Sequence, residues 1–244
     1  MVSRTAQPHR TARADAKPAR RASPLRAAAT ATPRLPRRAS GRARFELLVD
    51  ATDRLLGERD AGDVSLYDIA AIAGVPTASV YHFFPSTAAA FVALAQRYLA
   101  HFREIVAAPL DHAALTGWQD IFHIKGAQAR AFYNQHVIAC KLFLGSEYSW
   151  HVRLADIEGN REFGQIVAAA CRKHFELPGD SGLVEEIEIA IGISDSIWSL
   201  SYQRHGFITD YYARESVRAY NAYIGLYLPT YLPRREQPLP DAAA

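Results

Sequence analysis

Apolar residues recur at helical spacing along most of the chain, and signals for strands are weak. Phe45, Leu48, Thr52 and Leu55 share one face of a helix. Neither a sustained alternation of apolar and polar residues nor an Asn-Gly hairpin signal occurs. Later periodic runs predict helices at about 114–134, 136–144, 147–176, 182–206 and 210–228. The pattern therefore predicts an all-α protein of about nine helices.

Two short helices with a tight turn between them stand near the start of this pattern. Ser65 begins a capping box for a helix over about 66–73, and Gly74 is expected to end that helix. Pro76 fits the first turn of a second helix, over about 77–83. This arrangement matches a helix-turn-helix motif, whose second helix enters the major groove of DNA.

The residues of this motif resemble a known signature. Three segments carry the resemblance: Asp68-Ile69-Ala70, Ala73-Gly74-Val75-Pro76 and Val80-Tyr81-His82-Phe83-Phe84-Pro85-Ser86. Over about residues 44–92 they look like the TetR family of bacterial transcriptional regulators, and beyond this range only the helical layout is similar. The resemblance implies a three-helix DNA-binding domain and a C-terminal helical domain. It also implies a homodimer formed through the last two long helices, and a small-molecule effector that alters the spacing of the DNA-reading heads.

The resemblance also places DNA contacts at the positions that match the family's pattern. These are Arg44, Ser65, Tyr67, Thr77, Ala78, Ser79, Tyr81 and His82. Thr87 is also a candidate, although it replaces a Lys that usually meets a phosphate, and Ala78 replaces a small Gly. We expect four arginines to compensate for the missing cation: Arg37, Arg38, Arg42 and Arg44. Thr77 and Ser79 are expected at base edges and Tyr81 at a phosphate, whereas His82 suits either.

The charge of +3 is distributed very unevenly along the 244 residues. Residues 1–44 hold eleven Arg, one Lys and one acidic residue, whereas the rest holds 16 basic and 24 acidic residues. With five prolines and no aromatic residue, 1–40 is expected to be a disordered basic arm. Beside the motif, such an arm favours double-stranded DNA as the partner rather than a membrane. The predicted divisions are the arm 1–40, a helix-turn-helix domain 41–88, an effector-binding and dimerisation domain 89–232, and a flexible tail 233–244.

Aromatic and weakly polar residues gather in the predicted C-terminal domain. An apolar pocket with a few hydrogen-bonding groups suits a lipophilic or aromatic effector, although aromatic residues at helical spacing are also typical of a core. The candidates for ligand binding are Trp118, Phe122, His123, Phe132, Tyr133, Cys140, Trp150, Trp198 and Tyr202.

The last two helices carry more apolar surface than one protomer needs to cover, which indicates a homodimer. The candidates for dimerisation are Ile189, Ile193, Ile197, Val217, Tyr220, Ile224 and Tyr227.

The sequence contains no pattern typical of catalysis. GxSxG, HExxH and phosphate-loop motifs are missing, and the helical pair His136 and Cys140 has no evident third metal ligand. We therefore expect no catalytic residue, no metal and no cofactor. Two alternatives stay open: a nucleoid-type protein that binds DNA without sequence choice, and a helical enzyme acting on a lipophilic substrate.

Targeting signals are also missing from the sequence. It has no apolar run of the ~18 residues that a membrane span needs, no signal-peptide pattern and no disulfide framework. The prediction is a cytoplasmic bacterial regulator, more in keeping with a repressor than an activator. Its homodimer would bind an inverted-repeat operator and be released by a small effector.

Overall fold

The computed structural model describes residues 31–146, 150–179 and 183–240, and every extended regular element in these ranges is helical. The α-helices are α2 (Ala39–Glu58), α3 (Leu66–Ala73), α4 (Thr77–Phe83), α5 (Thr87–Ala107), α6 (Trp118–Gln135), α7 (Val137–Leu144), α8 (Trp150–His174), α9 (Val184–His205) and α10 (Asp210–Ile224). Two short 3₁₀ helices, η1 (Ala61–Asp63) and η2 (His112–Ala114), follow α2 and α5. The predicted all-α fold is confirmed.

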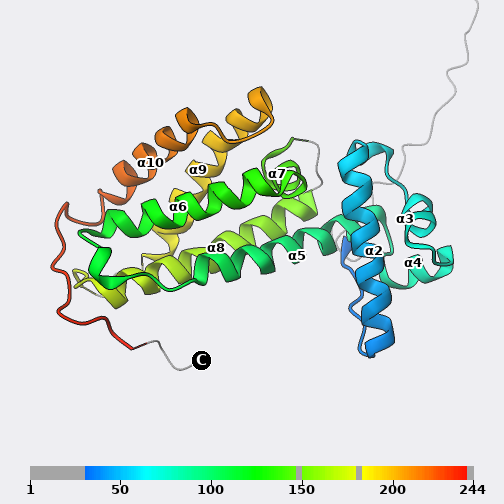
Figure 1. Ribbon diagram of the computed structural model, residues 1–244, viewed down its shortest axis with the longest axis horizontal. Helices are drawn as coiled ribbons and strands as arrows, with labels where there is room; N and C mark the ends of the chain where they lie inside the picture. Colours follow the sequence, from blue (N-terminus) through cyan, green and yellow to red (C-terminus); the bar gives the residue numbers. More distant parts are fainter. Residues whose placement is uncertain (1–30, 147–149, 180–182, 241–244) are drawn as a thin grey trace, which may run out of the picture.

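Helices α2, α3 and α4 form a small head at one end of the molecule (Figure 1). The head has its own apolar centre, where Leu48, Ile69 and Val80 are fully buried, one from each helix. The Phe45 ring lies edge-on to the Phe83 and Phe84 rings, with centroids 5.9 and 5.2 Å away. These contacts hold the short helix α4 at a fixed angle to α2.

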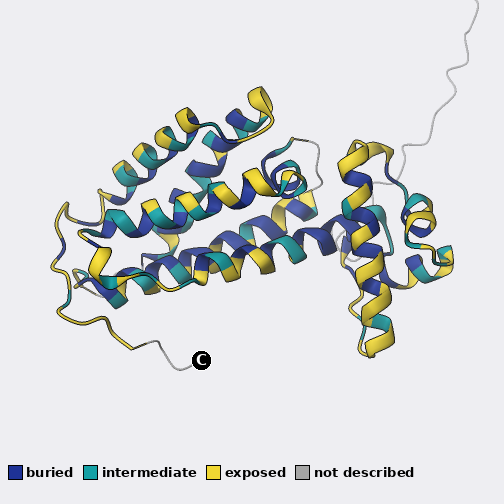
Figure 2. Ribbon diagram, viewed as in Figure 1, coloured by how far each residue is buried: buried dark blue, intermediate teal, exposed yellow. Residues whose placement is uncertain are grey.

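The other helices form an elongated body, into which α5 runs from the head (Figure 1). Helices α5 and α8 lie side by side, and their buried faces are directed toward α6 and α9 (Figure 2). Two glycines of α8 permit this close packing. A Cβ on Gly159 would lie 2.9 Å from a methyl of Leu99, and one on Gly164 would lie 3.0 Å from the Val184 carbonyl oxygen.

The expected domain boundary at 88/89 falls in the first turn of α5, so one continuous helix joins head and body.

Segments at both ends of the described chain are held against the fold, unlike the expectation. The Arg34 amide donates to the Phe83 carbonyl (2.8 Å), and α2 already begins at Ala39. Near the C-terminus, the Glu176 amide donates to the Pro233 carbonyl (2.9 Å). These bonds correct the predicted disorder of 31–40 and the predicted loose tail at 233–240, because backbone hydrogen bonds hold both segments. Residues 1–30 and 241–244 lie outside the described part of the chain.

Among the described residues, no single helix is long and apolar enough to cross a membrane. One bent pair of helices, α4 with Thr87–Val106 of α5, is long and apolar enough for a membrane span by length and composition alone. Most apolar side chains of α5 are buried in the protein core.

Candidate nucleic-acid interface and effector cavity

The turn between α3 and α4 has the local geometry that the sequence predicts. The Ser65 hydroxyl accepts from the Asp68 amide (3.2 Å), and the Asp68 carboxylate accepts from the Ser65 amide (3.0 Å), which completes the capping box. Arg59 also donates to this carboxylate (3.1 Å). The hydrogen bonds from Ser65, and then that from Arg59, lower the pKa of Asp68. Gly74 ends α3 with a φ of 65°, a conformation that favours glycine.

Helix α4 has one buried face and one face open to solvent. Val80 and Phe83 are buried, whereas Ala78, Tyr81 and His82 are exposed and Thr77 and Ser79 are half-buried. Pro76 is the residue before the helix rather than part of its first turn. The structure therefore gathers the predicted recognition residues at one surface of the head.

Two tyrosines extend this surface from α3 to α4. Tyr67 and Tyr81 are both exposed, and their rings lie edge-to-face with centroids 6.5 Å apart. The neighbouring Tyr67 phenol raises the pKa of Tyr81, so the Tyr81 hydroxyl keeps its proton at neutral pH. Protonated phenols can donate hydrogen bonds to phosphate oxygens.

A basic groove of about 800 Å³ lies beside α4. Four arginines line it together with Ser79 and His82: Arg34, Arg37, Arg38 and Arg44. Arg44 donates to the Ser79 hydroxyl (3.4 Å), which directs this side chain toward α4. Arg34 was not among the sequence candidates, because nothing in a Pro- and Arg-rich segment indicates where it packs.

The remaining two DNA candidates lie at the edges of this surface. Arg42 is exposed, and its guanidinium donates to the Arg37 carbonyl oxygen (3.0 Å), so it fastens the segment that carries the other arginines. Thr87 is half-buried at the first position of α5, directly after the capping residue Ser86. The structure places Ser65 half-buried at the start of α3.

The body encloses a cavity of about 80 Å³ between α5, α6, α8, α9 and α10. Three of the nine ligand candidates line it: Phe122, Tyr133 and Trp198. Sequence reasoning missed others that line it, among them Phe102, Asn160, Phe163 and Asp195. They come from α5, α8 and α9, and sequence periodicity alone does not show that these faces meet.

The other six ligand candidates lie elsewhere. Trp118, Phe132 and Cys140 are buried in the core away from this cavity, Tyr202 is half-buried, and His123 lines a neighbouring groove between α6 and α10. Trp150 is 67% exposed at the start of α8, which corrects its assignment to a pocket.

His136 lies at the junction of α6 and α7, where its ring contacts His101. No group of three metal-ligating side chains occurs within the described ranges.

Buried polar groups lie at one side of the cavity. Asp195 of α9 accepts a hydrogen bond from the Asn160 side chain of α8 (3.0 Å), and both residues are buried. Burial, with the nearby charge of Asp156, raises the pKa of Asp195 to about 7. Asp156 is paired with Arg153, but its burial outweighs this pairing and raises its pKa to about 6.

The outer surface of α9 exposes apolar side chains. Ile189 is 45% and Leu200 46% exposed, and Ile193 and Ile197 are half-buried. On and after α10, Val217 is half-buried and lines the groove toward α6, and Tyr227 is exposed. Tyr220 and Ile224 are buried inside the protomer, at 5% and 0% exposure. This corrects their assignment to the dimer surface, because their side of α10 packs inward.

Polar contacts fasten the head to the body at two places. Arg97 of α5 pairs with Asp50 (2.5 Å) and Asp53 (3.4 Å) of α2. Lys141 of α7 donates to the carbonyl oxygens of Leu56 (3.2 Å) and Arg59 (2.8 Å) at the end of α2. Both helices that contact α2 in this way also contact the helices around the cavity.

Comparison with known proteins agrees with this architecture. Residues 48–94 match the model for bacterial regulatory proteins of the tetR family. A search among curated proteins gave no match. Among solved structures, the chain is similar to a TetR-family transcriptional regulator from Streptomyces coelicolor, with 20% identity and a TM-score of 0.58 over 76% of this chain and 98% of that one.

Two further structures share the fold. One is the fatty acid degradation regulator FadR from Bacillus halodurans, with 13% identity and a TM-score of 0.52 over 74% of this chain and 94% of that one. The other is SmeT of Stenotrophomonas maltophilia, with 14% identity and a TM-score of 0.50 over 80% of this chain and 97% of that one.

The head with its exposed α4 and the helical body have the architecture of a helix-turn-helix transcription regulator with a C-terminal helical domain. The match covers most of the head, with the capping box and the Gly74 turn, and the first two turns of α5. Residues 48–94 match the tetR family of bacterial regulatory proteins, and the chain as a whole shares the fold of a TetR-family transcriptional regulator.

Proposed function

We propose that this regulator is a homodimeric repressor that binds an inverted-repeat operator and is released by a small lipophilic or aromatic effector. The observation that carries the proposal is the exposed face of α4 beside a groove lined by four arginines. The arginines supply phosphate contacts, while the side chains of α4 supply base contacts. Among proteins of similar fold, SmeT is described as the repressor of a multidrug efflux pump, and one SmeT structure is a complex with triclosan.

The dimer is proposed to form through the outer face of α9 together with α10. Exposed Ile189 and Leu200 are two turns or more apart on α9, so they form a long apolar surface rather than an isolated contact. A two-fold axis along this surface places the two heads in symmetric positions. Symmetric heads read symmetric half-sites about one helical turn of DNA apart, ~34–36 Å.

The effector is proposed to act through α7. Tyr133 lines the cavity, and its ring lies 6.4 Å from that of Phe143 on α7. The same helix carries Lys141, which holds the end of α2. An effector that displaces Tyr133 therefore acts on a helix that is fastened directly to the DNA-binding head.

Footprinting on genomic fragments tests the DNA-binding part of the proposal. We expect protected inverted repeats, and Thr77→Ala should relax the preference at one position of each half-site at a cost of about 1–3 kcal/mol. Thr230→Ala is the matched control, because Thr230 is exposed after α10. Uniform coating of all fragments would instead favour a nucleoid-type protein.

Light scattering tests the dimer. Leu200→Glu places a charge on the proposed apolar surface and should produce monomers, because an unpaired charge is costly in a desolvated interface. Leu47→Glu is the matched control, since Leu47 is similarly exposed but lies on α2. A dimer that tolerates Leu200→Glu would place the interface elsewhere.

A further inference from the structure

The walls of the cavity are dominated by aromatic rings. Rings from five helices line it: Phe102, Phe122, Tyr133, Phe163, Trp198 and Tyr220. The faces of such rings carry negative electrostatic potential, which attracts a cation as well as apolar surface. The lining therefore accepts both an uncharged aromatic molecule and an organic cation, and the polar groups must distinguish them.

The polar groups of the cavity favour a positive charge over a negative one. Asp195 is buried and receives a side-chain hydrogen bond from neutral Asn160, and no Lys or Arg of the described ranges forms an ion pair with it. A buried carboxylate without a cationic partner is unfavourable, so a cation entering the cavity would supply the missing charge. Tyr220 adds a buried hydroxyl that has no hydrogen-bond partner among the described residues.

Lys125 is the one described basic residue that lines the cavity, and its charge is directed elsewhere. Its ammonium donates to the Ala108 carbonyl oxygen at the end of α5 (2.7 Å). This carbonyl belongs to a helix C-terminus, which favours a positive charge. Lys125 thus offers the cavity mainly its hydrocarbon chain rather than a site for an anion.

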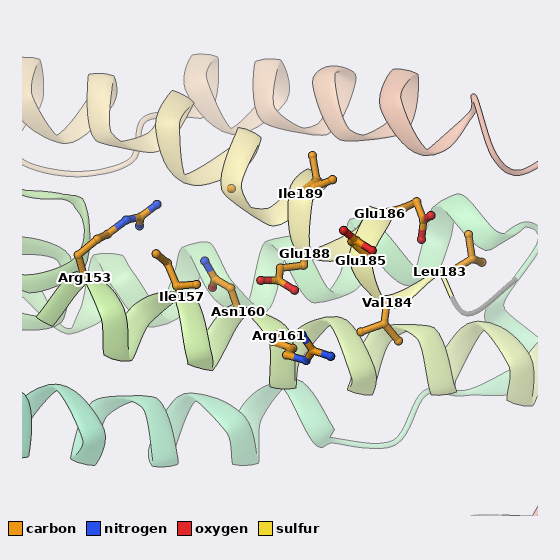
Figure 3. A pocket seen from close by; sticks show the side chains of 11 residues that line it. Arg153, Ile157, Asn160, Arg161, Leu183, Val184, Glu185, Glu186, Glu188 and Ile189 are labelled. Carbon is orange, nitrogen blue, oxygen red and sulfur yellow. The ribbon is translucent and has the colours of Figure 1, made fainter. Parts of the chain in front are cut away.

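An open groove of about 680 Å³ between α8 and α9 meets the cavity at Asn160, which lines both. Figure 3 shows Asn160 and Glu188 in the space between the two helices. Glu185 and Glu186 line the same groove. Of its two arginines, Arg153 is already paired with Asp156, which leaves Arg161 among three glutamates. The route to Asp195 is therefore rich in carboxylates that attract a cation.

We propose that this cavity binds a lipophilic organic cation, with the charged nitrogen at the Asp195 carboxylate and the apolar part among the aromatic rings. The inference rests on the proposed effector-controlled function and names the chemical class of the effector. Pockets for small molecules usually measure about 300–1,000 Å³, so the rings must turn and the helices must separate as the ligand enters. That displacement would reach Tyr133, from which the path to α7 begins.

Three probes of similar shape and different charge test the inference by calorimetry on the full-length protein. Benzyltrimethylammonium is the cation, neopentylbenzene its uncharged counterpart, and benzylsulfonate the anion. We expect the cation to bind tightest. Asp195→Asn should weaken its binding about thirtyfold or more, as expected for loss of a buried charge partner, and leave neopentylbenzene unaffected. Asp63→Asn removes an exposed carboxylate from the head and is the matched control.

Equal or tighter binding of either other probe to the unmodified protein would overturn the inference. So would unchanged affinity of folded Asp195→Asn for the cation. The comparison of probes needs no variant, so it decides the question even where the variant fails to fold.

Footprinting without any probe separates this inference from the proposed function. A protein that protects an operator but does not prefer the cation refutes the inference alone. A protein that binds the cation through Asp195 but protects no operator refutes the proposed function, and its ligand site stands.

Discussion

Replacing Asp195 by Asn should change how the stability of the protein depends on pH. Burial raises the pKa of the Asp195 carboxyl from 3.8 to about 7. A carboxyl whose pKa is higher in the folded state binds more protons when folded, so the folded state loses stability as the pH rises from about 4 to about 7. At 1.36 kcal/mol per pKa unit, this shift amounts to up to about 4 kcal/mol.

The variant removes this loss without removing the local hydrogen bond. The introduced amide would carry no charge, and its carbonyl oxygen can still accept from Asn160. We expect the two proteins to have similar free energies of unfolding near pH 4. Near pH 8 the variant should be more stable by up to about 4 kcal/mol.

Charged neighbours on the packed helices affect the size of this difference but not its sign. Asp156 raises the pKa of Asp195, whereas Arg153 and the hydrogen bond from Asn160 lower it. Asp156 and Arg153 are present in both proteins. The Tyr133 phenol has a strongly raised pKa, mainly because it is buried, so it stays neutral throughout this pH range.

Urea unfolding at a fixed protein concentration, followed by tryptophan fluorescence between pH 4 and 8, measures the effect. Asp63→Asn serves as the control for loss of an exposed carboxyl and should follow the unmodified protein. A stability difference between Asp195→Asn and the unmodified protein that does not grow with pH would refute the reasoning. In that case the carboxyl would not be desolvated in solution.

Three further substitutions have directions that follow from the structure. Ser65→Ala removes half of the capping box and should lower the free energy of unfolding by about 1 kcal/mol in urea titrations. Ile224→Ala should cost about 2–5 kcal/mol in the same assay, because Ile224 is fully buried, and a cost near zero would return this residue to a surface role. Arg44→Ala should weaken DNA binding about equally for all sequences and reduce the salt slope by about 1, which gel-shift titrations at several salt concentrations can measure.

The head could be predicted closely because its signals are local. A capping box needs only Ser65 and Asp68, three positions apart, and a left-handed helix end needs only a glycine such as Gly74. The order and spacing of these residues were also sufficient to recognise the family. The arginine segment before α2 is different, because the position of Arg34 depends on a backbone contact with Phe83, which is far away in the sequence.

The body could be predicted only in outline, because helical periodicity does not tell which side of a helix faces inward. The apolar stripe on α10 suited a dimer surface as well as a core, and the structure buries Tyr220 and Ile224 in the protomer. For a related reason, the sequence does not indicate Asp195 as a residue of the cavity. A single acid on a long helix looks like a solvated residue until the packing of α8 against α9 shows that it is enclosed.

The two apolar faces of α9 have different roles once burial is known. Ile187 and Trp198 point into the body with Asp195, whereas Ile189 and Leu200 point outward. The wall of the cavity and the proposed dimer surface are therefore opposite sides of one helix. In the proposed dimer the outer face of α9 is held by the partner, so a ligand that separates α9 from α8 would move α8, and α5 packed against it, relative to the two-fold axis. Because α5 runs into the head, we expect the effector to change the spacing of the two heads through α8 and α5 as well as through α7.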